Sequence, residues 1–283
     1  MDSSQVDHDT LPTLFIPHGG GPCFFMDWTM GPADTWHKMG HWLKNLGESL
    51  GSASVSTKPV SDPKAIVVFS AHWENDIVTI NSAARPELIF DYYNFPPHTY
   101  DLEYPAPGDP ELANTIERML SNAGIGCRQD PDHGFDHGVF VPFMLIYPAA
   151  NIPIVQVSLV KSLDPEEHLK IGQALAALRK ENVLLVGSGM SYHNMTALMS
   201  ADRSHADSDF FDHWLTDICE STPNQRNQAL CNWHAAPGAR QAHPREEHLL
   251  PLMVVAGAAT SDCGKKIYSD RVLGAAVSAF RFG

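Results

Sequence analysis

Short apolar runs rich in β-branched and aromatic residues alternate along this chain with segments of helical periodicity, and this alternation limits the possible folds more than any other feature. Such runs, bounded by turn-forming residues, are typical of strands that are buried on both faces of a sheet. Strands that alternate with helices favour a parallel sheet, because parallel strands need a crossover connection. We therefore predict an α/β fold, a single domain with a mostly parallel central sheet flanked by helices. The expected strands are residues 11–17, 64–71, 152–159 and 182–187, and the expected helices are residues 34–50, 110–123, 165–180, 207–219 and 249–259.

Helix-capping residues and a proline-rich stretch predict two helix N-termini and one long loop. Asp109 and Asp164 each precede a proline and a glutamate, which predicts two helix N-termini with proline in the first turn. Residues 84–110 are rich in proline and aromatic residues and show little periodicity, so we expect a long loop that could act as a lid. Because no break in composition splits the chain, we predict a flexible N-terminus over residues 1–10 and one α/β domain over residues 11–283.

The charge and cysteine counts exclude some partners. Nineteen Lys and Arg residues against 33 Asp and Glu residues give a formal net charge of -14, which disfavours binding to nucleic acid or to an anionic membrane surface. The five cysteines are scattered and form no C-x-x-C pair, as expected for free thiols in a reducing compartment. The first residues show no cationic and apolar leader, and no apolar stretch reaches membrane-spanning length. We therefore expect a soluble cytoplasmic protein.

Histidine is unusually frequent, with 15 residues among 283, and three histidines follow expected strands. His18 follows the first strand and precedes three glycines, His72 follows the strand that ends at residue 71, and His193 lies shortly after the strand 182–187. Open α/β sheets bind ligands at the carboxyl ends of their strands, where imidazoles from several strands can converge on one ion. Each of these histidines could instead cap a turn or be a structural histidine with satisfied hydrogen bonds.

A further pair, His243 and His248, comes just before the apolar segment 249–259. The H-x-x-x-x-H spacing differs from H-E-x-x-H and so does not predict a metalloprotease. Glu247 and His248 are adjacent, and we expect only one of them to be a ligand. A solvated, charged turn before a buried helix is the alternative interpretation.

Two other histidines could move protons or contact a ligand. His137 follows Asp136 in an apolar, glycine-bearing stretch, so it could be a proton donor with an adjusted pKa or a buried histidine bound to a backbone carbonyl. His98 lies in the proline-rich segment and could be an ordinary loop residue. The Gly-Ser-Gly sequence at 187–189 does not fit the G-x-S-x-G pattern, which disfavours a serine hydrolase. Several imidazoles without a thiolate suit either zinc or non-haem iron.

Six sequence motifs occur in the order found in a known family. They are P-H-G-G-G-P (17–22), S-A-H-W (70–73), F-P-P-H-T-Y-D-L-E-Y-P-A-P-G (95–108), F-D-H-G-V-F-V-P (135–142), G-S-G-M-S-Y-H-N-M (187–195) and H-P-R-E-E-H-L-L-P-L (243–252). This set, which spans nearly the whole chain, resembles the class III extradiol ring-cleavage dioxygenases, and within them the 4,5-DOPA extradiol dioxygenase branch, related to the catalytic subunit of protocatechuate 4,5-dioxygenase. The resemblance implies a single catalytic α/β domain with its metal site at the carboxyl ends of strands. It also implies cleavage of a catecholic ring by O₂ to a muconate semialdehyde.

The resemblance also implies roles for individual residues. His18, His72 and His248 fall on metal-ligand positions of the family. His193 matches a histidine that belongs to the metal site in DOPA-type members and acts as the acid/base in protocatechuate-type members, so both roles are predicted for it. His137 is the second candidate for acid/base catalysis.

The implied cofactor is Fe(II) in the active form, with zinc possible in the same site. Better-known members of the family use a glutamate where this pattern has His248, so the neighbouring Glu247 is the alternative third ligand.

A small catecholic substrate and O₂ are the expected partners. The composition of the aromatic loop suggests that the substrate pocket is lined by Tyr93, Phe95, His98 and Tyr100. The sequence leaves open which catechol is used, whether the 4,5 or the 2,3 bond is cleaved, and the oligomeric state. Two alternatives stay open as well: a zinc-dependent hydrolase, and a non-catalytic metal-binding or redox relative of the same superfamily.

Overall fold

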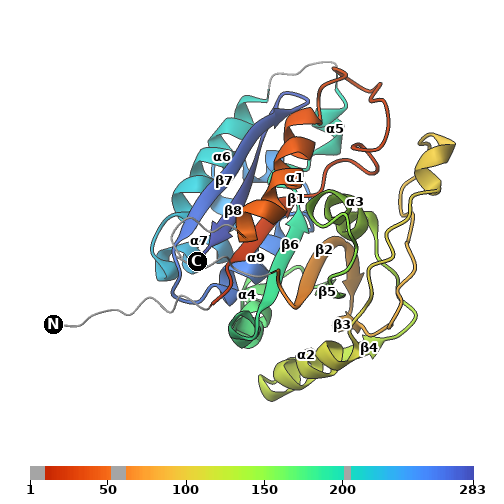
Figure 1. Cartoon of the computed structure of the whole chain (residues 1–283). Coiled ribbons are helices and arrows are strands. Elements are labelled where there is room, and N and C mark those ends of the chain that lie inside the picture. Colours follow the sequence, from red (N-terminus) through yellow and green to blue (C-terminus); the bar gives the residue numbers. More distant parts are fainter. Residues whose placement is uncertain (1–9, 52–61, 201–204) are drawn as a thin grey trace.

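A sheet of eight strands with helices on both faces forms the centre of the protein (Figure 1), in a computed structural model that describes residues 10–51, 62–200 and 205–283. The strands are β1 (Thr13–Pro17), β2 (Ala65–Asn75), β3 (Val78–Asn81), β4 (Cys127–Asp130), β5 (Ile154–Val160), β6 (Val183–Gly189), β7 (Gly264–Val272) and β8 (Ala275–Phe282). The α-helices are α1 (His37–Gly51), α2 (Pro110–Asn122), α3 (His137–Ile146), α4 (Pro165–Leu175), α5 (Met195–Leu198), α6 (Ala206–Cys219), α7 (Pro223–Cys231), α8 (Ala239–Ala242) and α9 (Leu250–Ala258). Three 3-10 helices complete the list: η1 (Pro97–Tyr100), η2 (Ala176–Glu181) and η3 (Trp233–Ala235).

The four central strands of the sheet pair in parallel, and at one outer edge β4 also pairs in parallel with β3. The strand order is β4-β3-β5-β2-β6-β1-β8-β7. Strands β5, β2, β6 and β1 pair in parallel, whereas β3 is antiparallel to β5 and the β7–β8 hairpin is antiparallel to β1. Every residue of β1, β5 and β6 is buried, as expected for strands covered on both faces. The predicted single α/β domain with a mostly parallel sheet is therefore confirmed.

Alternate residues of β2 show how the two faces are covered. Val67 and Phe69 pack in a cluster with apolar residues of α2, α4 and α9. Ile66 and Val68 belong to a second cluster, which includes buried residues of α1 and α3. This alternation follows from the two-residue period of a strand, which sends successive side chains to opposite faces.

Most of the expected elements are present, with differences at their ends. The predicted N-caps are confirmed, since the side chains of Asp109 and Asp164 accept hydrogen bonds from the backbone N–H groups of Leu112 and Glu166. The helix expected over residues 165–180 is wrong in its last five residues, where the chain tightens into η2. The predicted end of the second strand at residue 71 is also wrong, since β2 continues to Asn75.

The N-terminus and the proline-rich segment are the two expected irregular parts of the chain. Residues 1–9 of the expected flexible N-terminus lie outside the described residues, so the proposed division at residue 10 stays a prediction. The proline-rich segment contains η1 as its one helical turn among the described residues 84–109. In the described ranges, no helix combines the length and the apolar character that crossing a bilayer requires.

Helices α4 and α9 cross at two glycines, which lets their backbones come close together. A Cβ atom on Gly172 of α4 would lie 1.8 Å from the carbonyl oxygen of Val254 in α9. A Cβ atom on Gly257 of α9 would lie 2.1 Å from the carbonyl oxygen of Leu169 in α4. These contacts hold α9 close to α4.

Substitution of Gly172 tests this close crossing. We expect Gly172→Ala to lower the free energy of unfolding by about 1–3 kcal/mol, because the added methyl group overpacks the helix interface. The matched control is Gly126→Ala, whose Cβ would meet only the Cγ2 atom of Ile77, at 3.7 Å. The control should change the free energy of unfolding by less than about 1 kcal/mol. Urea unfolding measures both values, and equal stabilities of the two variants would contradict the close crossing.

Candidate metal centre

Three neighbouring strands deliver histidines to one edge of the sheet. His18 follows β1, His193 lies after β6, and His72 lies in the last part of β2. Since β2, β6 and β1 are adjacent in the sheet, their carboxyl ends meet there. Backbone hydrogen bonds hold the segments together: the N–H of His18 donates to the carbonyl of Gly189, and the N–H of Met190 donates to the carbonyl of His248.

His72 lies within β2 rather than after it, because the strand is irregular. The pairing of β2 with β5 shifts in register between Phe69 and Glu74, as at a β-bulge or a similar irregularity. Bulges bend a strand and redirect a side chain, and they are frequent next to functional sites. The N–H of His72 donates instead to the Oγ atom of Ser70, at 3.2 Å. The local irregularity therefore places the imidazole of His72 at the sheet edge although the strand does not end there.

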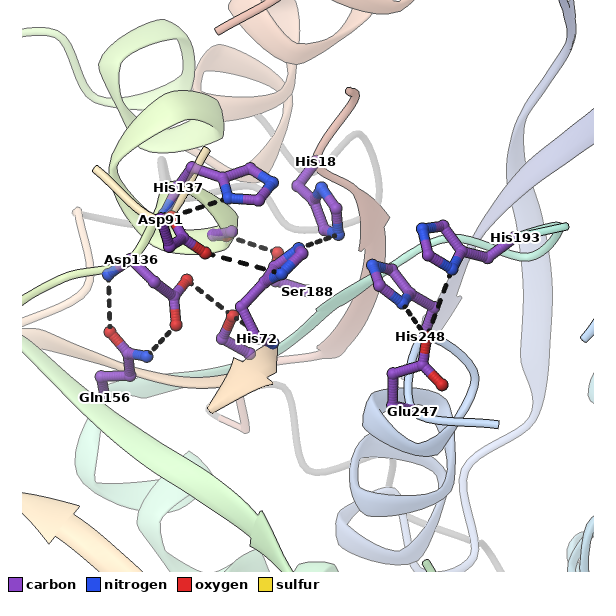
Figure 2. Close-up of polar contacts among 12 residues, drawn as sticks. His18, His72, Asp91, Asp136, His137, Gln156, Ser188, His193, Glu247 and His248 are labelled. Carbon is purple, nitrogen blue, oxygen red and sulfur yellow. Dashed lines mark hydrogen bonds and ion pairs between the residues drawn. The ribbon is translucent and has the colours of Figure 1, made fainter. Parts of the chain in front are cut away.

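The imidazoles of His18, His72 and His248 converge (Figure 2). Their ligand nitrogens lie within 4.8 Å of one another, and the Nε2 atoms of His18 and His72 are 3.3 Å apart. Two nitrogens bound to one ion at metal–nitrogen distances of about 2.1 Å would be separated by about 3.0–3.4 Å for tetrahedral or octahedral angles. The side chains come from three segments that are remote in sequence, as the strand-end argument predicts.

His248 and its neighbour Glu247 form a hydrogen-bonded pair. The Nδ1 atom of His248 lies 2.8 Å from Oε1 of Glu247, and because an ionised carboxylate only accepts, Nδ1–H is the donor. The Nε2 atom of His248 then carries a lone pair; it is buried and has no hydrogen-bond partner, and the residue is 3% exposed. Glu247 does not join His18 and His72 but lies behind His248, where its carboxylate orients the ring.

His193 stacks on His248 instead of pointing between His18 and His72. The two ring centroids are 3.3 Å apart and the planes are nearly parallel. The Nδ1 atom of His193 lies 3.3 Å from the same Oε1 atom of Glu247. One carboxylate therefore orients both rings, and His193 is partly exposed while His248 is buried.

His137 lies on the opposite side of the cluster from His193 (Figure 2). Its ring centroid is 3.9 Å from that of His72 and 5.3 Å from that of His18. Its Nδ1 atom lies 2.8 Å from Oδ1 of Asp91, which also accepts from the backbone N–H of His137 at 3.0 Å. The second oxygen of Asp91 lies 3.6 Å from Nδ1 of His72. Asp91, a residue of the proline-rich segment that the sequence did not single out, thus contacts two histidines of the cluster.

Asp136, the sequence neighbour of His137, is directed toward β2 and β5 and away from the imidazole cluster. Its carboxylate does not pair with His137 but accepts from the hydroxyl of Ser70, at 2.7 Å, and from the amide of Gln156. The start of α3 thus turns the side chain of Asp136 toward the sheet, and the Nδ1 atom of His137 pairs with the Asp91 carboxylate instead of a backbone carbonyl. Burial, and to a lesser degree the charge of Asp91, raise the pKa of Asp136 to about 6.

Burial keeps the converging imidazoles neutral. The pKa values of His18, His72 and His248 lie well below the ordinary histidine value, first because desolvation disfavours the imidazolium and second because neighbouring imidazoles repel a second charge. The carboxylates behave in the opposite way. Burial disfavours the charge on Asp91, but hydrogen bonds and attraction from His137 outweigh it and lower the pKa of Asp91. For Glu247, burial is likewise outweighed by the contact with His193, and its pKa is lowered.

The aromatic loop contacts the cluster through a residue that the sequence analysis passed over. Tyr92 is buried, and its ring centroid lies 5.9 Å from that of His137. Tyr93 is 78% exposed, so its side chain faces solvent.

The other loop residues lie around Tyr92. Phe95 and Tyr100 pack against the ring of Tyr92, and the exposed His98 has its Nε2 atom 3.2 Å from the carbonyl oxygen of Phe25. The roles of Tyr93, His98 and Tyr100 in substrate binding stay predictions.

Fold and site together define a class of protein. It is an α/β protein in which buried, neutral imidazoles converge at the carboxyl ends of parallel strands, and two histidines paired with carboxylates lie on either side. This is the arrangement of a non-haem metal-dependent enzyme.

Comparison with known proteins gives the family. A sequence model described as the catalytic LigB subunit of aromatic ring-opening dioxygenase matches residues 13–281. A relative named dioxygenase tasH, from Hapsidospora irregularis, is 39% identical over 287 residues, which cover 96% of this chain and 85% of the relative. The 4,5-DOPA dioxygenase extradiol of Beta vulgaris is 41% identical over 200 residues, covering 70% of this chain and 74% of the relative. The crystal structure of an uncharacterized protein from Escherichia coli K12 aligns with a TM-score of 0.72 at 27% identity, over 96% of this chain and 100% of that chain.

The chain belongs to the LigB family of aromatic ring-opening dioxygenases. The predicted family and the predicted enzyme class, an extradiol ring-cleavage dioxygenase, are confirmed. Membership implies a non-haem metal, a small aromatic substrate and O₂.

The lowered histidine pKa values predict how the metal-free protein responds to acid. In the folded protein the three imidazoles stay neutral at pH values where the unfolded chain, with a histidine pKa of about 6.5, binds protons. The free energy of unfolding should therefore fall as the pH drops from 6.5 to 5. Each of the three histidines contributes up to about 1.4 kcal/mol per pH unit. Asp136 acts in the opposite direction, because its folded carboxyl keeps a proton up to about pH 6 that the unfolded one releases near pH 4.

Urea unfolding with a chelator at pH 7, 6 and 5 measures this dependence. We expect His248→Gln to make the free energy of unfolding less dependent on pH, because one of the three histidines with a lowered pKa is removed. His234→Gln, at an exposed position, is the control and should keep the wild-type slope. A slope in His248→Gln that equals the wild-type slope would contradict the assignment of a buried, neutral imidazole.

Proposed function

We propose that this protein cleaves a catechol-type ring next to its hydroxyl groups, at a metal held by His18, His72 and His248. The observation that supports this most directly is the Nε2 atom of His248, which is buried, unpartnered and grouped with the nitrogens of His18 and His72. A buried acceptor without a partner costs free energy unless something binds to it. A metal ion accounts for all three nitrogens at once.

The donor set suits a divalent ion of intermediate softness. Three neutral imidazoles can hold Fe(II) or zinc, and the residues supply no thiolate. We propose Fe(II) as the cofactor of the active protein, because oxygen chemistry needs a redox-active ion, with zinc able to occupy the same nitrogens. When bound by His18, His72 and His248, Fe(II) would supply binding of the catechol oxygens and of O₂ and the redox chemistry that joins them.

Between Glu247 and His248, we propose His248 as the third ligand. The hydrogen bond from Nδ1 of His248 to Glu247 fixes the tautomer that leaves Nε2 free to bind. This also assigns Glu247 a role, since a carboxylate behind a ligand imidazole orients the ring and increases its basicity.

We propose that His193 and His137 do the acid/base work. Each donates its Nδ1–H to a carboxylate, Glu247 and Asp91 respectively, which leaves Nε2 as the basic atom. His193 is partly exposed and lies against the ligand set, where it can accept a proton from a substrate hydroxyl and return it later. His137, on the other side, is the second candidate. Their opposite positions would allow one to take a proton while the other gives one.

The aromatic loop would shield the reacting groups from water. Tyr92 packs near His137, and its hydroxyl donates to the carbonyl of Thr99, which holds the loop closed on itself. Phe95 lies against Gly21, where an added Cβ would be only 3.1 Å from the ring, so the third glycine after His18 leaves room for the loop. An apolar wall of this kind suits a flat aromatic substrate.

Anaerobic reconstitution with Fe(II), followed by a panel of catechols, tests the function. We expect O₂ consumption and the yellow absorbance of a muconate semialdehyde with at least one catechol. His18→Ala or His72→Ala should lose metal and activity together, because two imidazoles hold an ion poorly. The control is His168→Gln, a buried histidine outside the cluster whose Nε2 atom accepts from the backbone N–H of Val160.

The control variant should bind metal like the wild type. Hydrolysis of an ester or amide by the zinc form without O₂ uptake would favour the hydrolase alternative. Metal binding without turnover of any catechol would favour the non-catalytic relative. Retained activity in metal-replete His72→Ala would remove the ligand assignment.

Substitution of His193 separates ligand from acid/base roles. We expect His193→Ala to keep most of its metal and to lose about 10²–10⁴-fold in kcat, the usual size of an acid/base contribution. Metal content and single-turnover absorbance on the same sample measure both effects. His137→Ala provides the comparison: a larger loss of kcat in His137→Ala than in His193→Ala would transfer the main role to His137. Loss of the metal from His193→Ala would make it a ligand instead.

We also keep the prediction of a cytoplasmic location. All five cysteines are free thiols, which supports a reducing compartment.

A further inference from the structure

We propose that Arg245 is a positioning residue of the metal centre: it clamps the end of β2, which carries His72, to the segment that carries Glu247 and His248. The inference rests on the proposed metal site and adds a residue that touches neither metal nor substrate. It assigns the clamp to three charged side chains, Glu74, Arg245 and Glu247.

The first half of the clamp is a two-point contact between remote segments. The Nη1 and Nη2 atoms of Arg245 lie 2.5 and 2.6 Å from Oε1 and Oε2 of Glu74. Two parallel N–H···O bonds between a planar guanidinium and a carboxylate fix direction as well as distance. Glu74 lies two residues beyond His72, and 171 residues separate it from Arg245. The clamp thus joins two of the segments that must meet for His72 and His248 to converge.

The second half of the clamp orients the shared carboxylate. The Nη1 atom of Arg245 also lies 3.3 Å from Oε2 of Glu247. The other oxygen, Oε1, faces Nδ1 of His248 at 2.8 Å and Nδ1 of His193 at 3.3 Å. Figure 2 shows both rings directed at this carboxylate. With Oε2 held by Arg245, rotation of the carboxylate is restricted, and Oε1 stays on the imidazole side.

The exposure of Arg245 argues against a role in global stability. Its side chain is 52% exposed, and ion pairs in that setting contribute little to the free energy of unfolding. The effect of the clamp is therefore expected at the site, where the positions of ligands and of their hydrogen-bonded carboxylates determine metal affinity.

The same segment offers a matched control. Arg240 is 50% exposed and pairs with Glu246 at 2.6 Å, so its exposure and its ion pair resemble those of Arg245. In the described part of the chain, the Glu246 carboxylate contacts no histidine of the cluster. A loss of surface charge alone should affect Arg240→Gln and Arg245→Gln equally.

Cobalt binding is the readout, because it needs no turnover. Co(II) affinity is measured by competition with a chromophoric chelator, and the visible spectrum of bound Co(II) reports ligand geometry. We expect Arg245→Gln to weaken Co(II) binding about 10-fold and to change the spectrum, as typical for loss of an outer partner of a metal ligand. Arg240→Gln should match the wild type in both. Without metal, Arg245→Gln should melt close to the wild type, because the Arg245 side chain is half exposed.

Two further variants make the test specific. Arg245→Lys should recover part of the affinity, because a single ammonium can hold one carboxylate but cannot reproduce the fork. Glu74→Gln should also weaken Co(II) binding, and the double variant should be no worse than Arg245→Gln, since Arg245→Gln already removes both halves of the clamp.

Several outcomes would overturn the proposal. Equal Co(II) affinity and spectra in Arg245→Gln and Arg240→Gln would do so. A raised KM confined to carboxylate-bearing catechols, with Co(II) binding unchanged, would make Arg245 a substrate-binding residue instead. If the wild type does not bind Co(II), the proposed metal site itself is wrong. If the wild type binds Co(II) and consumes O₂ with Fe(II), and Arg245→Gln does the same, only the role of Arg245 is wrong.

Discussion

The site depends on keeping imidazole nitrogens unprotonated inside the protein. Burial does this for His18, His72 and His248, because an imidazolium without solvent is unfavourable, and a second charge among neighbouring rings is more so. The carboxylates complete the effect without protonating the rings. Glu247 takes the Nδ1–H of His248 and Asp91 takes that of His137, so that in each ring Nε2 carries the lone pair. The same hydrogen bonds thus determine the orientation of these imidazole rings and which of their nitrogens carries the proton.

The sheet brings these groups together with few degrees of freedom. The carboxyl-terminal parts of the adjacent parallel strands β2, β6 and β1 lie at one edge, and the backbone hydrogen bond from His18 to Gly189 aligns β1 with β6 there. The fourth segment comes from the start of α9, whose position against α4 is set by the close crossing at Gly172 and Gly257. A displacement of that helix would move His248 relative to His18. Packing far from the cluster therefore controls the separation of its nitrogens.

The sequence predicted the buried strands at the centre of the fold and the positions of His18 and His193 after two of them. It did not predict which carboxylates pair with the histidines of the cluster. Continuous apolar runs mark strands buried on both faces, so the positions of His18 and His193 after strands could be predicted. The β7–β8 hairpin was missed because β7 is largely polar, and its turn at Leu273 and Gly274 uses positive φ at a leucine, where such turns usually have asparagine or glycine. Asp91 pairs with His137 across 46 residues, and no local pattern encodes such a contact.

The chemical type of the third metal ligand, a carboxylate or the imidazole of His248, determines how much positive charge a bound ion keeps for the substrate. A carboxylate there would cancel half the charge of a divalent ion directly, whereas three neutral imidazoles cancel none. In this protein the negative charges of Glu247 and Asp91 stand one imidazole away, where their attraction is weaker because it falls with distance. Under the proposed function, the site would keep a strong attraction for catechol oxygens that lose protons, and the same two carboxylates would prepare His193 and His137 to accept those protons. Placing the carboxylates behind histidines rather than among the proposed ligands would therefore serve substrate binding and proton transfer together.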